Sequence, residues 1–166
     1  MAIIYPEGTL SKPVLNWGYD AKTDTQSFSA SSSLTTISNC TVTMALQNSS
    51  NNFLVLGQIT IGCANATSVI ATLQADGSEI DALRGAADGS RLRSTSRGSQ
   101  DNTYEAHTWP LVGTYSPGTT SSIAFTIGGS TNAGTFYVNR GGTSNNDTSR
   151  DSTRSFTSLQ VFELAA

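Results

Sequence analysis

The chain has 166 residues, a length typical of a single domain, and only 13% of them are charged. Serine (24) and threonine (23) are abundant, whereas lysine, which favours helix surfaces, occurs twice, so the composition excludes a helical bundle. The formal net charge of −3 argues against nucleic acid as a partner. No apolar run approaches the ~20 residues that a membrane-spanning helix needs, so we expect no membrane partner.

Short stretches in which apolar and polar residues alternate follow one another along the chain, as in strands with one buried face. In the longest stretch every second residue from Phe53 to Cys63 is apolar or glycine, and its other face begins apolar with Leu54 and Leu56. In chain order, the expected strands cover residues 40–46, 53–63, 69–75, 78–83, 106–115, 123–127, 136–138 and 156–164.

Residues typical of turns and loops separate these strands. Asp76-Gly77 predicts a tight hairpin turn. Residues 84–103 are rich in Gly, Ser, Asp and Arg and almost lack apolar residues, which predicts a long surface loop, and residues 140–151 form a second polar loop. About eight to ten strands without a helix favour an all-β fold, an antiparallel sandwich.

The last expected strand is apolar on both faces. Leu159 and Val161 point to one side, and Phe162 and Leu164 point to the other. A sheet that has one face in water has one polar side, so a second apolar face predicts contact with a neighbouring subunit. The stretch 53–56 is apolar on both faces and leads to the same expectation.

The segment Phe136-Tyr137-Val138-Asn139-Arg140, the polar loop after it and a closing strand that ends Val-Phe-Glu-Leu resemble the last strands of a family of tailed-phage structural proteins. Proteins of that family have a jelly roll like those of tumour necrosis factor and the complement globular heads. The Ser/Thr-rich stretch 28–42, the hairpin 71–80 and the strand pair 109–127 fit the family in the same order. The sequence departs from the family at Ala75, where an arginine usually precedes the Asp-Gly turn.

The resemblance covers roughly residues 14–164 and implies a trimeric jelly-roll sandwich in a virion structural protein. We expect one jelly-roll domain at 14–166, preceded by an extended arm at 1–13 with no fibre shaft. These features predict a trimeric capsid decoration or cement protein that binds the outside of the phage head and stabilises it. The alternative is a receptor- or glycan-binding head domain of a virion fibre or other appendage. For a decoration or cement protein, we expect assembly in the host cytoplasm and a final location in the virion, on the capsid surface.

Three groups of residues are candidates for contacts with partners. A capsid-binding arm, suited to a groove on the major capsid protein, contains Ile3, Ile4, Tyr5 and Pro6. The expected homotrimer interface contains Leu54, Leu56, Tyr137, Leu159, Val161, Phe162 and Leu164. A candidate capsid-contact loop contains Arg84, Arg91, Arg93 and Arg97.

No pattern of catalytic or metal-binding residues accompanies these groups. His107 is the single histidine and no nucleophile motif lies near it, so we expect a structural histidine and no enzymatic activity. Asp147 and Asp151 lack the spacing of a calcium loop, and no cofactor is expected. Cys40 and Cys63 lie in apolar stretches, which fits either two buried thiols or a cross-strand disulfide.

Overall fold

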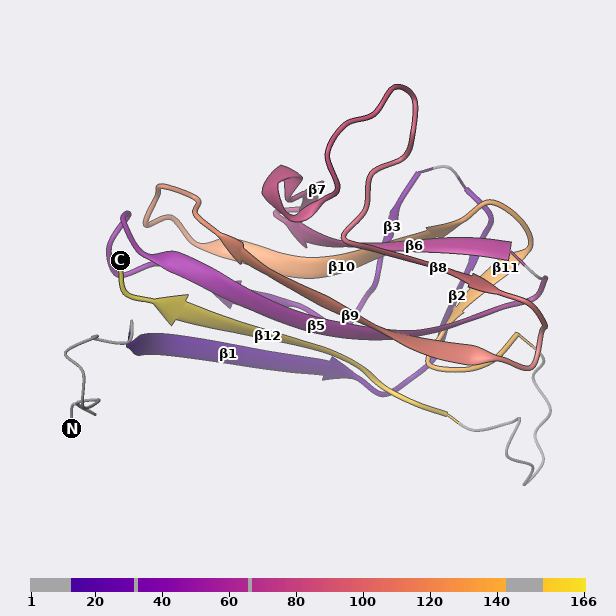
Figure 1. Ribbon diagram of the computed structural model, residues 1–166. Helices are drawn as coiled ribbons and strands as arrows, with labels where there is room; N and C mark the ends of the chain where they lie inside the picture. The colour runs from indigo at the N-terminus through magenta and orange to yellow at the C-terminus, as the bar shows by residue number, and fades with distance from the viewer. Residues whose placement is uncertain (1–12, 32, 66, 143–153) are drawn as a thin grey trace, which may run out of the picture.

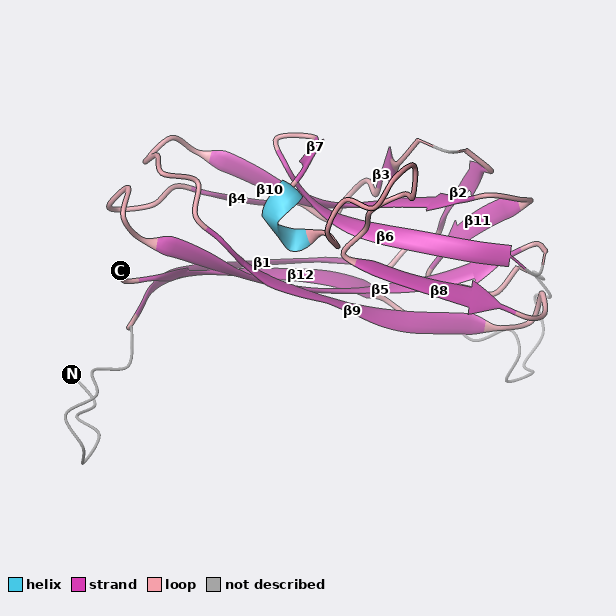
Figure 2. Ribbon diagram, turned by 45° about the horizontal axis from the view of Figure 1, so that its top comes forward, coloured by secondary structure: helices cyan, strands magenta, loops and turns pink. Residues whose placement is uncertain are grey.

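The computed structural model of the protein describes residues 13–31, 33–65, 67–142 and 154–166. Two antiparallel sheets of six strands each lie face to face, which confirms the expected all-β sandwich (Figure 1). Among the described residues the one helical element is the short 3₁₀ turn η1 (Asp81–Leu83), drawn in cyan in Figure 2.

The first sheet has the strand order β1-β12-β5-β11-β2, with β9 on the other side of β5. Its strands are β1 (Val14–Lys22), β2 (Gln26–Ser29), β5 (Asn52–Cys63), β9 (Ala106–Tyr115), β11 (Thr135–Val138) and β12 (Thr157–Leu164). β11 and β12 lie end to end along one side of β5, because Val138 pairs with Ile61 and Ser158 pairs with Gln58. β2 and β1 pair with them in the same way and form the outer edge.

The second sheet has the order β3-β10-β6-β7, with β4 on β10 and β8 on β6. Its strands are β3 (Thr35–Thr36), β4 (Val42–Met44), β6 (Thr67–Ala75), β7 (Ser78–Glu79), β8 (Ser96–Gln100) and β10 (Ile123–Thr131). Pairs of short strands again share one position, β3 with β4 and β7 with β8. Successive positions alternate between the two sheets, except that β7 and β8 follow β6 within the second sheet, in the manner of a jelly roll.

The core lies between the two sheets and follows the alternation that the sequence predicts. Every second residue of β5 from Phe53 onward is buried, as expected for the inner face of a half-exposed strand. The ring of Phe125 on β10 makes T-shaped contacts with two rings of the first sheet, at 4.9 Å from Phe53 and 6.2 Å from Tyr115 between centroids. These rings join the sheets at one end of the sandwich.

The hairpin at Asp76-Gly77 is confirmed, since both residues have positive φ angles, 50° and 76°, as the tight turn requires. The return strand is shorter than expected, because β7 covers only Ser78–Glu79 before the chain turns into η1. The expected strand at 40–46 is likewise reduced to β4.

The expectation of one long loop at residues 84–103 is wrong. The second half of this stretch forms β8, which pairs with β6 from Thr67 to Ala71. The residues of β8 that point inward are Ser96, Gly98 and Gln100, so the sequence of β8 shows no apolar alternation. Gln100 is buried and donates from Nε2 to the carbonyl of Ile61 on the opposite sheet.

Candidate functional site

The outward face of the first sheet carries several large exposed apolar side chains. Gly18 of β1 faces the core, because a Cβ at this position would overlap the side chain of Val42. Its neighbours Trp17 and Tyr19 therefore point away from the core, and they are 63% and 52% exposed. Large aromatic residues with this much exposed surface are typical of interfaces.

The strand register extends this surface across the sheet. Trp17 pairs with Phe162 on β12, and Phe162 pairs with Leu54 on β5. Paired residues of adjacent strands point to the same side, so each pair lies on the outward face. The next row runs from Tyr19 through the polar Gln160 on β12 and then Leu56 on β5 to β9. The apolar side chains of the two rows and their neighbour on β12 define what we call the apolar face: Trp17, Tyr19, Leu54, Leu56, Val112, Phe162 and Leu164.

The apolar face contains no charged side chain. The other outward positions within and around it on β1, β5, β9 and β12 are also uncharged: Ala21, Gln58, Pro110, Thr114, Ser158 and Gln160. An antiparallel sheet that faces water carries polar and charged residues there. The central part of this sheet is instead suited to contact with another apolar surface.

Four of the seven residues predicted for the trimer interface belong to the apolar face. Leu54 and Leu56 of β5, and Phe162 and Leu164 of β12, are half-buried within the chain and point outward. Trp17, Tyr19 and Val112 complete the face but were not part of the prediction, although Val112 is 59% exposed. Apolar residues alternate along β1 and β9 in the sequence. This alternation identifies the three residues as part of the apolar face only once β1 is placed beside β12 and β9 beside β5.

Two residues of the predicted interface are placed elsewhere. Leu159 and Val161 are fully buried in the core between the sheets. The prediction is wrong for these two residues, because the face of β12 that carries them packs against the protein's own second sheet. The sequence shows that β12 has two apolar faces but does not show which one is the core.

Tyr137 points outward at the far end of the same sheet. It pairs with Gly62 on β5, three rows beyond Leu56 in the register, and polar residues lie between them. The guanidinium of Arg140 stacks on its ring, 3.8 Å from the centroid. Tyr137 therefore lies outside the apolar face and has a partner within the chain.

Three of the four predicted loop arginines are paired with carboxylates of their own segment. Arg84 and Arg93 both donate to Asp81 Oδ1 at 2.6 Å, and these contacts hold the pKa of Asp81 below its ordinary value. Arg84 also pairs with Glu79. The loop thus uses most of its positive charge to fix its own conformation.

The other two arginines are more exposed. Arg91 Nη1 lies 3.1 Å from Asp88 Oδ2, in a pair that is open to solvent. Arg97 projects from the outward side of β8 and donates to Ser68 Oγ at 3.3 Å. The four arm residues Ile3, Ile4, Tyr5 and Pro6 lie outside the described residues.

The remaining residues considered as candidates for chemistry are the single histidine and the two cysteines. His107 Nε2 lies 3.2 Å from Glu105 Oε2, and this contact lowers the pKa of Glu105. Cys40 and Cys63 are both buried and free, and burial raises the pKa of each thiol to about 11. The described ranges contain no group of three or more His, Cys, Asp or Glu side chains placed to hold a metal ion. They also contain no helix long and apolar enough to cross a membrane.

Comparison with known proteins identifies no family and finds distant structural similarities. No family model matches the sequence, and no curated protein matches it. The chain is similar to the VP2 subviral particle of infectious bursal disease virus, with 12% identity and a TM-score of 0.42 over 100% of this chain and 42% of that one. Structures of the Gx and Gt strains of the same virus give 13% and 12% identity, with TM-scores of 0.41 and 0.42. The chain covers 42% and 45% of those two, less than half of the length of each.

Proposed function

We propose that this chain is a virion structural protein, a homotrimer that decorates the outside of a capsid and stabilises it. The observation that carries the proposal is the apolar face, an uncharged surface on the first sheet whose largest side chain, Trp17, is 63% exposed. The jelly-roll fold and the resemblance of the closing strands to tailed-phage structural proteins support the same function.

The apolar face fits contact with further copies of the same chain. Leaving apolar area in water costs roughly 25 cal/mol per Å², so covering an aromatic and aliphatic surface of this kind favours association. Tryptophan and tyrosine at the centre of an interface contribute more than other residues, because they bury a large area in few rotamers. The absence of charge across the face means that identical copies meet without repulsion. The number three comes from the resemblance.

The proposed mechanism of stabilisation is mechanical. Each subunit of the trimer makes one contact with the major capsid protein, through the arm at residues 1–13. Once one subunit is bound, the other two contacts form at a high effective concentration, so three weak contacts hold strongly. A trimer that spans a boundary between capsid subunits then resists their separation. This role needs no enzymatic activity, no cofactor and no nucleic acid.

Charged substitutions on the apolar face test the trimer. We expect Trp17→Asp and Phe162→Asp to convert a particle of three times 17.4 kDa into a monomer in sedimentation equilibrium, because each would bury an unpaired carboxylate in the interface. Thr43→Asp, on an exposed position of β4 in the other sheet, is the matched control and should remain a trimer. An unchanged trimer for both test variants would show that the face is not the interface.

A second candidate function is a receptor- or glycan-binding head of a virion appendage, which a pocket on the second sheet, lined by both polar and apolar side chains, favours. The copy number in purified particles separates the two functions. Hundreds of copies in an icosahedral ratio to the major capsid protein support decoration, whereas a few copies in a multiple of three support an appendage head. Absence of the chain from particles would contradict both.

A further inference from the structure

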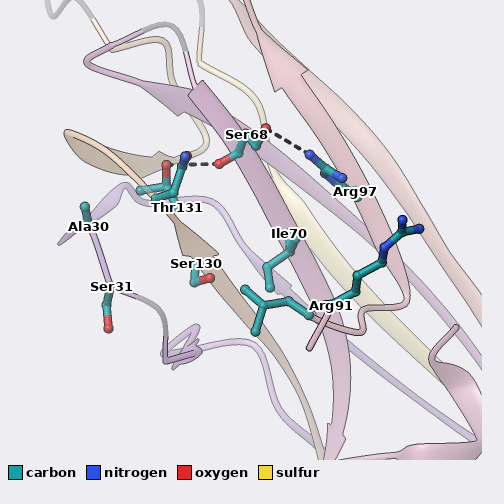
Figure 3. Close-up of a pocket in the computed structure, with 10 residues that line it drawn as sticks. Ala30, Ser31, Ser68, Ile70, Arg91, Arg97, Ser130 and Thr131 are labelled. Carbon is teal, nitrogen blue, oxygen red and sulfur yellow. Dashed lines mark hydrogen bonds between the residues drawn. The ribbon is translucent and has the colours of Figure 1, made fainter. Parts of the chain in front are cut away.

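A pocket of about 690 Å³ lies on the outward face of the second sheet (Figure 3). Arg91 and Arg97 lie on one side of it, Ala30 and Ser31 lie on the other, and Ile70 lies between them. The full set of lining residues is Ala30, Ser31, Ser68, Ile70, Arg91, Leu92, Arg97, Ser130, Thr131 and Asn132.

The strand register builds the floor of this pocket. On β6 the residues Val69 and Ala71 are fully buried, so the alternate residues Ser68 and Ile70 point outward. Ile70 pairs with Arg97 on β8 and with Ser130 on β10. A cationic, an apolar and a hydroxyl side chain therefore lie in one row across three adjacent strands, and the sheet holds them in fixed order.

Arg97 brings to the pocket a positive charge that no carboxylate among the described residues pairs with. Arg84, Arg91 and Arg93 each pair with a carboxylate, whereas Arg97 donates to Ser68 Oγ at 3.3 Å. A guanidinium has five N–H donors in a planar fork that matches a carboxylate in bidentate geometry. None of the described residues that line the pocket is acidic. The site is therefore suited to an anionic group.

The other walls combine hydroxyl groups with apolar surface. The hydroxyls of Ser31, Ser68 and Ser130 both donate and accept hydrogen bonds. Leu92 is 69% exposed and lies at the pocket with Ile70, which adds an apolar surface. A sugar ring has the same combination, since hydroxyl groups surround C–H faces. The volume lies within the range of about 300–1,000 Å³ that is usual for ligand sites.

We propose that this pocket binds a carboxylate-bearing sugar residue of an acidic polysaccharide, with the carboxylate on Arg97 and the ring between the serine hydroxyls and Leu92. The inference goes beyond the proposed function, because an acidic-sugar site can serve a capsid decoration protein as well as an appendage head. The pocket and the apolar face lie on opposite sides of the sandwich. A trimer built on the first sheet therefore leaves all three pockets accessible.

The test uses a trisaccharide of galacturonic acid as the probe and its methyl ester as the uncharged counterpart, titrated into the full chain by calorimetry. We expect the acid to bind at least tenfold more tightly than the ester. Arg97→Gln should weaken binding of the acid at least tenfold, and Arg91→Gln should weaken it less, because Arg91 is already paired with Asp88. Arg154→Gln, an exposed arginine that does not line the pocket, is the matched control and should bind like the unmodified protein.

Three results would overturn the inference. Equal binding of the acid and the ester would remove the role of the carboxylate, and equal binding by Arg97→Gln would remove the role of Arg97. Binding of inorganic phosphate without binding of the trisaccharide would show a general anion site. Sedimentation of the same samples reports the oligomeric state separately. A lack of sugar binding at the pocket can therefore be distinguished from a lack of trimer formation. Circular dichroism of each variant confirms that it is folded.

Discussion

The indole ring of Trp109 on β9 lies directly over Gly98 on β8. These two strands belong to different sheets, so one ring and one glycine close this edge of the sandwich. A Cβ at position 98 would overlap the indole atoms Cζ2 and Cε2. The contact explains why a residue without a side chain stands on the inward side of β8.

Gly98→Ala should therefore destabilise the protein. Overpacking of this kind costs about 1–3 kcal/mol in the free energy of unfolding, because the indole must move to make room. Urea unfolding measures the loss, and tryptophan emission in a Trp17→Phe background should shift toward longer wavelengths as Trp109 gains solvent contact. Gly85→Ala is the control, since a Cβ at Gly85 would have no atom within 4 Å apart from its own residue and its two chain neighbours. Equal stability of both variants would contradict the closing role of the contact.

The same contact shows where prediction from sequence fails. β5, β6 and β9 were predicted because their inward residues are apolar and alternate with others. β8 fills its inward positions with residues such as Gly98 and Gln100. The apolar side chain that covers Gly98 is Trp109 on the other sheet, and Gln100 is held by a hydrogen bond to the carbonyl of Ile61. When the apolar side chains that pack against a strand belong to another strand, its own sequence shows no apolar alternation.

Asn139 ties the end of β11 to β1 and β12, and we expect Asn139→Ala to be strongly destabilising. Its Nδ2 donates to the carbonyls of Lys22 and Asp24, both at 2.8 Å, and its Oδ1 accepts from Thr157 Oγ1 at 2.8 Å. Its φ of 65° is also unfavourable for alanine. The expected loss is about 2–4 kcal/mol, measured by urea unfolding.

Asn139→Gly separates the two contributions. Glycine tolerates the positive φ but lacks the side-chain hydrogen bonds, so its stability should lie between those of the unmodified protein and Asn139→Ala. If the glycine and alanine variants are equally stable, the backbone conformation contributes nothing. If both variants are as stable as the unmodified protein, the side-chain hydrogen bonds of Asn139 do not contribute to stability either.

Glu163 is a fully buried carboxylate that holds the turn before β5. Its Oε1 accepts from the backbone N–H of Gln47 and from Asn51 Nδ2, both at 2.7 Å. Glu163→Ala should lower the free energy of unfolding by about 2–4 kcal/mol, because two buried donors lose their acceptor. Glu163→Gln retains an acceptor oxygen and should lose much less in the same chemical denaturation. A glutamine variant as unstable as the alanine variant would mean that the charge, rather than the acceptor, is required.

The two buried thiols make the stability of the protein fall at high pH. Burial raises the pKa of Cys40 and of Cys63 from 9.0 to about 11, so the folded state holds these protons more tightly than the unfolded state. The stabilisation is complete below pH 9 and is lost as the pH rises from 9 through 11. A Cys40→Ala, Cys63→Ala double variant should show a smaller loss of stability between pH 8 and pH 10.5.

The reactivity of the same thiols provides an independent check. At pH 8 a thiol reagent should modify the folded protein slowly and should modify two groups per chain rapidly in denaturant, because the thiolate is the reactive form. Rapid modification of the folded protein would contradict the burial. A reducing agent should leave the midpoint of unfolding unchanged, since both cysteines are free.

The candidate site was predictable only in part. The two apolar faces of β12 are evident from the sequence, and Phe162 does lie on the outward one. The sequence could not assign Val161 to the core, because each face contains residues of similar hydrophobicity and only the position of the second sheet distinguishes them. The pocket could not be predicted at all, since Arg97, Ile70 and Ser130 become neighbours through the register of three strands.

The pairing of β1 with β12 has a consequence for synthesis of the protein. β12 lies between β1 and β5 and pairs with both, so neither has this neighbour until Thr157–Leu164 has left the ribosome. The growing chain therefore carries Trp17 and the apolar residues of β5 without their partner strand through most of translation. Such long-range pairing is slow and leaves strand edges open to other chains. A host chaperone that protects these edges during translation should raise the yield of folded protein.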